Sequence, residues 1–242
     1  MTTKIPVKLK PNSGKIPLKL KPHKVNGVIV ANQAGDLPYS YHPQVFPIAK
    51  ISSILTHLAS LEYFYTYYYM FADFKKSPRK MRWIADDPSW VYHFSHQHIG
   101  GLQVHEWTPE ILAIKSEVEK LTGELFNAVL INEYQTGDSI TWHSDDDPWF
   151  GNDFIVASVS FGAEMVFKLR LKADNSKILP IKLENGSVIV MKKLCQKFWQ
   201  HSVPKQPSVK GVRYNLTFRK ILPHLVHKQS KGSKMEIPAD KL

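Results

Sequence analysis

A chain of 242 residues with 43% hydrophobic and 12% aromatic residues can bury a core, which excludes a wholly disordered protein. The single cysteine, Cys195, excludes an internal disulfide framework and fits a reducing, intracellular compartment. No apolar run approaches the roughly 18 residues of a membrane span, so we expect no membrane contact. The net charge of +11 lies mainly at the two ends, since residues 1–26 hold seven lysines and no acid. Net charge alone therefore does not indicate a nucleic-acid-binding fold surface.

The N-terminal segment carries a repeated Lys/Pro motif, KIPVKLKP at 4–11 and KIPLKLKP at 15–22. This composition cannot bury enough apolar surface to offset the entropy lost on ordering, so we expect residues 1–36 to form a disordered tail. A solubilising arm is the simplest role, and a nucleic-acid tether, a partner motif or a nuclear address are alternatives. We expect residues 223–242 to form a basic C-terminal tail.

Two amphipathic helices are expected next. Apolar residues recur at spacings of three and four between Ile48 and Leu61, which predicts one buried helix face. For the second helix, Thr108 can cap the start, Pro109 suits the first helical position and Gly123 can end it. We expect both helices to cover a sheet.

From about Phe126 the chain changes to short β-rich runs separated by polar turns. The runs are FNAVLINEY, IVASVSF, EMVFKLR, ILPIKL, SVIVM and RYNLTFR. Asn185-Gly186 predicts a tight hairpin between ILPIKL and SVIVM, and ADNS predicts another turn. Two helices followed by many short antiparallel strands predict an α+β fold with a double-sheet jelly-roll or barrel core.

The stretch HSDDD holds candidate metal ligands. Side chains two apart on an extended strand share a face, so His143 and Asp145 form an imidazole–carboxylate pair. His201, at the end of a later β-like run, offers a second imidazole. Two histidines and one carboxylate are typical of non-haem Fe(II) oxygenases. The alternative is a solvated acidic turn ahead of Pro148.

One polar strand face could bind an anionic cosubstrate. In RYNLTFR, polar residues alternate strictly with apolar ones; the polar set is Arg213, Asn215, Thr217 and Arg219. Such a face would ordinarily meet water, but two guanidinium groups in line also suit a dicarboxylate inside a barrel. Asn132 and Tyr134 of INEY again lie two apart on one face. Together with the metal ligands, these residues would form one pocket for Fe(II) and a keto-dicarboxylate.

The ordered combination of these motifs resembles the AlkB family of Fe(II)/2-oxoglutarate-dependent dioxygenases. The resemblance covers residues 37–222 and rests on INEY, HSD, ASVSFGA, GSVIVM, Trp199-x-His201 and RYNLTFR. It implies a double-stranded β-helix core, with iron held by His143, Asp145 and His201, and the use of 2-oxoglutarate and O2. It further implies that Arg213 grips the distal carboxylate of 2-oxoglutarate. The residues implied to assist are Asn132, Tyr134, Asn215 and Thr217, with Arg219 lining the cosubstrate and target-base end.

Residues 63–100 resemble the nucleotide-recognition lid of the DNA-repair branch of this family. The likeness rests on Pro78-Arg79-Lys80, on Tyr-x-Phe-Ser at 92–95 and on an apolar finger at 70–72. It implies substrate contacts by Met70, Phe71, Ala72, Arg79, Lys80, Tyr92, Phe94, Ser95 and Asp147. Ala72 stands where the duplex-acting relatives carry glycine, His96 follows Phe-Ser where glycine is usual, and Asp147 stands where some relatives carry glutamate.

These contacts make physical sense for an enzyme that extrudes a base. An apolar finger can fill the gap, Phe94 can stack on the flipped base, and the cluster KKSPRKMR can neutralise phosphates. Asp147 could accept a hydrogen bond from an exocyclic amino group. A core role for Phe71 and a solvated loop for the basic cluster are the alternatives.

The resemblance therefore implies oxidative dealkylation of N-alkylated DNA bases, with release of formaldehyde, succinate and CO2. Expected lesions are 1-methyladenine and 3-methylcytosine in double-stranded DNA, with the alkylated base flipped into a monomeric enzyme. In a eukaryotic host we expect a nuclear location. Alternatives are the same chemistry on RNA or protein, or a catalytically idle nucleic-acid-binding module.

Overall fold

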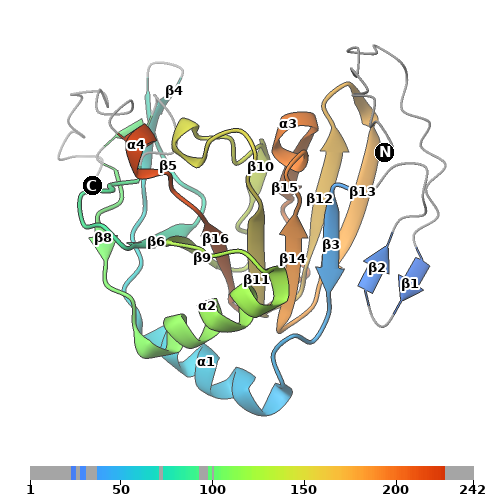
Figure 1. Ribbon diagram of the computed structural model, residues 1–242, viewed down its shortest axis with the longest axis horizontal. Coiled ribbons are helices and arrows are strands. Elements are labelled where there is room, and N and C mark those ends of the chain that lie inside the picture. Colours follow the sequence, from blue (N-terminus) through green and yellow to red (C-terminus); the bar gives the residue numbers. More distant parts are fainter. Residues whose placement is uncertain are drawn as a thin grey trace, which may run out of the picture.

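The computed structural model describes residues 37–70, 73–92, 98–99 and 101–226, and also the backbone of 23–25 and 28–30. Two sheets face each other, and helices α1 (Ile48–Ser60) and α2 (Pro109–Thr122) lie together at the bottom of the view in Figure 1. The two helices pack on the outer face of the larger sheet. The architecture is the α+β jelly roll that the sequence predicts.

The larger sheet has nine strands and is antiparallel except where β6 meets β8. Its order is β1 (His23–Val25), β2 (Val28–Val30), β3 (Tyr39–His42), β14 (Ser187–Met191), β11 (Val156–Gly162), β16 (Arg213–Arg219), β9 (Ala128–Tyr134), β6 (Lys80–Ala85) and β8 (Val104–His105). Strands β1 and β2, which lie within the expected N-terminal tail, extend this sheet beyond β3.

The smaller sheet has four strands, β10 (Ile140–His143), β15 (Trp199–Val203), β12 (Met165–Leu171) and β13 (Asp174–Leu183), in that order. A third sheet of three strands comprises β5 (Asp73–Lys76), β4 (Tyr67–Met70) and β7 (His98–Ile99) and lies within the expected lid. Three short helical turns complete the described chain, η1 (Pro148–Phe150), α3 (Cys195–Phe198) and α4 (Pro223–Val226). No helix within these described ranges is long and apolar enough to cross a membrane.

The two long helices form as their sequences predict. The Thr108 hydroxyl accepts a hydrogen bond from the Ile111 amide at the start of α2, and Gly123 ends this helix in the left-handed region at φ 71°. Ile51 and Leu58 of α1 are buried in the core under the large sheet. The helices therefore cover the outer face of the large sheet. Between the two sheets lies a second apolar cluster, which includes Phe167, Leu169 and Ile189.

Strand β16 shows how the alternation of the sequence builds the polar side of the space between the sheets. Tyr214, Leu216 and Phe218 join the core beneath the helices. The intervening residues face the space between the two sheets, because successive strand side chains point to opposite faces. A polar row of four residues thus runs along the inside of the molecule.

The predicted Asn185-Gly186 hairpin is wrong, although a turn occurs at that position. Strand β13 pairs with β12, whereas β14 pairs with β11 and β3, so the turn carries the chain from the small sheet to the large one. Gly186 has a φ of 81°, which explains why glycine follows asparagine there. The dipeptide encodes the local turn, while distant strands determine the pairing.

Candidate active site

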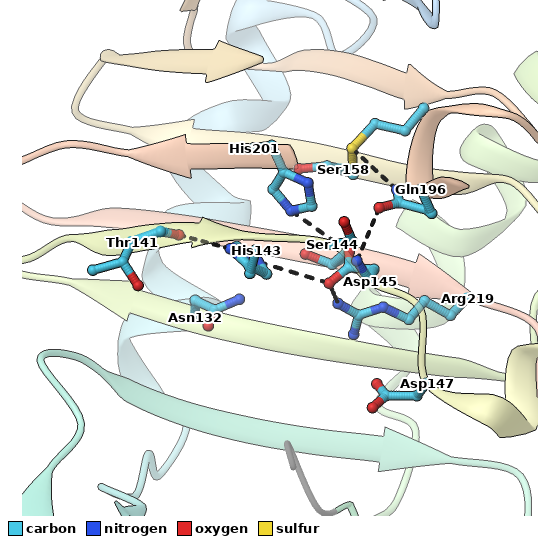
Figure 2. Close-up of polar contacts among 12 residues, drawn as sticks. Asn132, Thr141, His143, Ser144, Asp145, Asp147, Ser158, Gln196, His201 and Arg219 are labelled. Carbon is cyan, nitrogen blue, oxygen red and sulfur yellow. Dashed lines mark hydrogen bonds and ion pairs between the residues drawn. The ribbon is translucent and has the colours of Figure 1, made fainter. Parts of the chain in front are cut away.

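The three predicted metal ligands meet at one point between the sheets (Figure 2). His143 ends β10 and lies opposite His201 of β15 in the register of the small sheet, and Asp145 follows two residues later. The Nε2 atoms of His143 and His201 lie 3.8 Å and 3.9 Å from the Asp145 carboxylate oxygens. One donor atom from each residue lies within 4.8 Å of the others, an arrangement that suits three ligands of one metal ion.

Both imidazoles present Nε2 to this point, and their surroundings favour the neutral form. The His143 Nδ1 atom lies 2.8 Å from the Thr141 carbonyl oxygen, which can only accept, so Nδ1 carries the proton. Burial lowers the pKa of His143, and burial together with His143 lowers the pKa of His201 to about 3. Metal binding requires deprotonated ring nitrogens, and this site supplies them.

The third ligand is an ionised carboxylate. Burial alone would raise the pKa of Asp145, but the positively charged Arg219 guanidinium beside it holds that pKa well below its usual range. Arg219 Nη2 lies 2.9 Å from the Asp145 Oδ1 atom. Arg219, expected to line the cosubstrate end of the pocket, therefore also contacts a metal ligand.

A narrow cavity extends from the metal ligands between the sheets. Its lining includes all six residues predicted to bind the cosubstrate, which are Asn132, Tyr134, Arg213, Asn215, Thr217 and Arg219. Arg213 is only 1% exposed, and its Nη2 atom donates to the Ser160 hydroxyl over 3.0 Å. Its Nε and Nη1 atoms find no hydrogen-bond partner among the described residues. A buried cation with free donors fits a carboxylate group, because an uncompensated buried charge is costly.

Two serines of β11 complete this wall and were not singled out from the sequence. Asn215 Nδ2 donates to the Ser158 hydroxyl over 2.7 Å, and the Ser160 hydroxyl accepts the hydrogen bond from Arg213. In the strand register, Ser158 lies opposite Thr217 and Ser160 opposite Asn215. The alternation of serine with apolar residues in ASVSFGA was the available signal, since it gives β11 a polar inner face.

Arg79 lies inside the molecule and not on the basic surface where phosphate binding was expected. It is 5% exposed and donates from Nε to the Asn132 Oδ1 atom over 2.7 Å. The remaining basic residues have separate environments: Lys75 pairs with Asp73 at 2.7 Å, and Lys76 lies 4.0 Å from the Tyr65 ring centroid. Arg79 therefore lines the cavity beside the metal ligands.

A second cavity of about 370 Å³ opens beside the metal ligands. Its lining includes Tyr92 and Asp147, and the Tyr92 hydroxyl donates to the Asp147 Oδ2 atom over 3.3 Å. The Tyr92 ring stacks against both Trp83 and Trp149, with centroid distances of 4.6 Å and 5.6 Å, and the two tryptophan rings also stack on each other at 6.1 Å. Burial raises the pKa of Asp147 to about 7, although Arg219 acts in the opposite direction. A carboxyl group at an aromatic wall can orient a flat polar ligand.

Part of the expected lid cannot be placed in this cavity. Phe71, Ala72, Phe94 and Ser95 lie outside the described residues, and only the backbone of Met70 is described, at the end of β4. Lys80 begins β6 and is half-buried. Of the substrate contacts expected in the lid, Arg79 and Tyr92 line this cavity.

Comparison with known proteins identifies the site's relatives. Residues 39–219 match the family model of the 2OG-Fe(II) oxygenase superfamily. The chain is 36% identical over 157 residues to alpha-ketoglutarate-dependent dioxygenase alkB homolog 3 of Bos taurus. This match covers 61% of this chain and 53% of the relative. It is 35% identical over 162 residues to DNA oxidative demethylase ALKBH2 of Bos taurus, covering 64% and 57% respectively. The chain thus spans about half the length of the curated relatives it matches.

A solved structure titled "The structure of OsALKBH1" has the same fold. It superposes with a TM-score of 0.55 at 15% identity and covers 76% of this chain and 98% of its own. At that identity the likeness concerns the fold alone, and it confirms the predicted jelly-roll core.

Proposed function

The chain belongs to the 2OG-Fe(II) oxygenase superfamily, and from this premise we propose that it removes alkyl groups oxidatively from nucleic-acid bases. The observation that carries the proposal is the combination of three convergent metal ligands with the buried, partly unpaired guanidinium of Arg213 in one cavity. Two relatives support the reaction type through their names, a dioxygenase and a DNA oxidative demethylase.

His143, Asp145 and His201 would hold Fe(II), and Arg213 would bind the distal carboxylate of 2-oxoglutarate. When bound, iron and 2-oxoglutarate supply the oxidising chemistry: O2 is consumed, 2-oxoglutarate becomes succinate and CO2, and one oxygen atom enters a C–H bond of the substrate. The protein's contribution is placement. The His143 tautomer and the Arg219 contact keep the ligand atoms directed at one point.

We assign the second cavity to the alkylated base. A volume of about 370 Å³ lies within the roughly 300–1,000 Å³ typical of small-molecule sites. Tyr92 and Asp147 would orient the base, with Asp147 beside its exocyclic amino group, so that its alkyl group faces the metal ligands. Hydroxylation of an N-methyl carbon gives an N-hydroxymethyl group, which leaves as formaldehyde and restores the base. We propose 1-methyladenine and 3-methylcytosine as the lesions.

Double-stranded DNA is the substrate that we propose, with the damaged base flipped out of the stack. One of the named relatives is a DNA oxidative demethylase, and the sequence carries the apolar stretch Met70-Phe71 next to a basic segment. The lysines Lys75, Lys76 and Lys80 are the residues best placed in the sequence to meet phosphates.

Formaldehyde release from methylated oligonucleotides tests the proposal. The four substrates are single- and double-stranded DNA and RNA, each with Fe(II) and 2-oxoglutarate supplied. We expect the largest yield from duplex DNA and none when 2-oxoglutarate is left out. A larger yield from RNA would indicate that the same reaction acts on RNA. Binding of the oligonucleotides without formaldehyde release would indicate a catalytically idle binding module.

A further inference from the structure

Gln196 connects the two chain segments that carry metal ligands. It lies in α3, five residues before His201, and is only 2% exposed. Its Oε1 atom accepts a hydrogen bond of 2.9 Å from the backbone N–H of Asp145 (Figure 2). One side chain thus joins the backbone of one ligand to the segment that presents another.

The amide of Gln196 has a defined orientation. A backbone N–H can only donate, so the oxygen of the amide must face Asp145. Its Nε2 atom then lies 3.4 Å from the Met191 sulfur, and Met191 lines the same cavity as the metal ligands. Both the oxygen and the nitrogen of the amide therefore make contacts at the site, which leaves the side chain little rotational freedom.

Two neighbouring contacts also hold the loop that follows β10, through Ser144 and Asp146. The Ser144 hydroxyl donates to the Trp199 carbonyl oxygen over 3.0 Å. Lys172 donates to the backbone carbonyl oxygen of Gln196 over 2.8 Å and lies 3.7 Å from the Asp146 carboxylate. The loop that follows β10 is therefore attached to the segment 196–201 at consecutive residues.

Strand pairing ends before Asp145, and the Gln196 hydrogen bond holds the backbone at this point. The pairing of β10 with β15 finishes at His143 and His201, so the ladder that fixes the two histidines does not reach Asp145. The backbone at Asp145 sets where its carboxylate lies relative to both imidazoles. In other proteins, replacing a residue that orients a metal ligand commonly weakens metal binding by about 10- to 100-fold.

We propose that Gln196 is a positioning residue that sets the placement of Asp145 relative to His201 for metal binding. The inference rests on the metal site of the proposed function and not on the choice of nucleic-acid substrate. A purely structural role would instead reduce stability and leave the metal site of the folded protein unchanged.

The test compares Gln196→Leu with the matched control Gln206→Leu in the full chain. Gln206 also accepts a backbone hydrogen bond, from Val166 over 2.8 Å, but does not line the metal cavity. Calorimetric titration with Mn(II) alone measures affinity, and the visible spectrum with Co(II) reports coordination geometry. We expect Gln196→Leu to weaken Mn(II) binding by about 10- to 100-fold and to alter the Co(II) spectrum. Gln206→Leu should match the parent in both measurements.

Gln196→Met serves as a second variant, because methionine fills a similar volume flexibly and is tolerated in cores. Parent-like Mn(II) affinity and a parent-like Co(II) spectrum in the folded Gln196 variants would overturn the proposal. Failure of both variants to fold, while Gln206→Leu folds, would assign Gln196 a structural role and overturn it as well. A parent that binds no Mn(II) would instead refute the metal site itself, and a parent that binds Mn(II) but releases no formaldehyde would refute only the proposed substrate.

Discussion

Arg219 and Asp145 form a buried ion pair within the candidate metal site, with 2.9 Å between Nη2 and Oδ1. Both side chains are almost completely enclosed, and the Nε and Nη1 atoms of Arg219 have no hydrogen-bond partner among the described residues. Asp145 raises the pKa of Arg219 above its ordinary value, although burial lowers it. The pair therefore keeps the carboxylate ionised, and it makes the protein's stability depend on both partners.

Replacing Arg219 with methionine should destabilise the metal-free protein. Removing one partner of a buried pair leaves the other charge uncompensated, and we expect a loss of about 3 kcal/mol in the free energy of unfolding. Added Mn(II) should recover part of this loss, because the cation takes the place of the guanidinium beside Asp145. Urea denaturation with and without Mn(II) measures both effects.

Arg170→Met is the control for that variant. Arg170 donates to Gln200 over 2.7 Å and lies over the Trp142 ring, and it does not line the metal cavity, so its loss should cost only about 1 kcal/mol, a cost that should not change when Mn(II) is added. Equal losses of unfolding free energy in the two variants would show that the Arg219–Asp145 pair contributes no more to stability than an ordinary hydrogen bond.

Arg213→Met should raise the KM for 2-oxoglutarate by about 100-fold or more. The guanidinium has two free donors in the cavity, and truncating one partner of a buried charge pair costs about 2–5 kcal/mol. Arg213→Lys should recover only part of the loss, because an ammonium group lacks the two parallel donors of guanidinium. Succinate formation at varied 2-oxoglutarate measures KM, and a KM unchanged from the parent in Arg213→Met would remove this residue from the cosubstrate site.

The Cys195 thiol should be inert in the folded protein. Burial raises the pKa of Cys195 to about 12, so at pH 8 the nucleophilic thiolate is almost absent. Iodoacetamide should therefore leave the native protein unlabelled and label it after denaturation in urea, as mass spectrometry would show. Rapid labelling of the native protein would mean that α3, which carries both Cys195 and Gln196, opens readily.

Phe71→Ala should reduce activity on duplex DNA far more than on single strands. An apolar finger is needed to fill the gap that a flipped base leaves in a duplex, whereas a single strand has no such gap. The ratio of the two kcat/KM values is the informative quantity. Equal losses on both substrates would assign Phe71 to the core of the lid.

Local periodicity in the sequence predicted much of the site, because it determines which side chains share a strand face. Arg213 and Thr217 were expected on one face of β16 and line the cavity, while Leu216 was expected on the other and lies in the core. The caps of α2 were predicted for the same reason, since Thr108 and Gly123 act on adjacent backbone.

Long-range pairing could not be predicted from local patterns. Arg79 belongs to a basic cluster that is typical of a solvated loop, and its partner Asn132 lies 53 residues further along the chain. The Asn185-Gly186 turn likewise joins two sheets because of strand pairings far from it. Gln196 carries no motif at all, and only the folded chain shows its contact with Asp145.

The most direct test of the account is formaldehyde release from 1-methyladenine in duplex DNA, measured for the parent and for His143→Ala with Fe(II), 2-oxoglutarate and O2. We expect formaldehyde and succinate from the parent in equal amounts, and neither from His143→Ala, with DNA affinity little changed in that variant. Equal formaldehyde yields from the two proteins, or none from a parent that binds Fe(II) and 2-oxoglutarate, would contradict it.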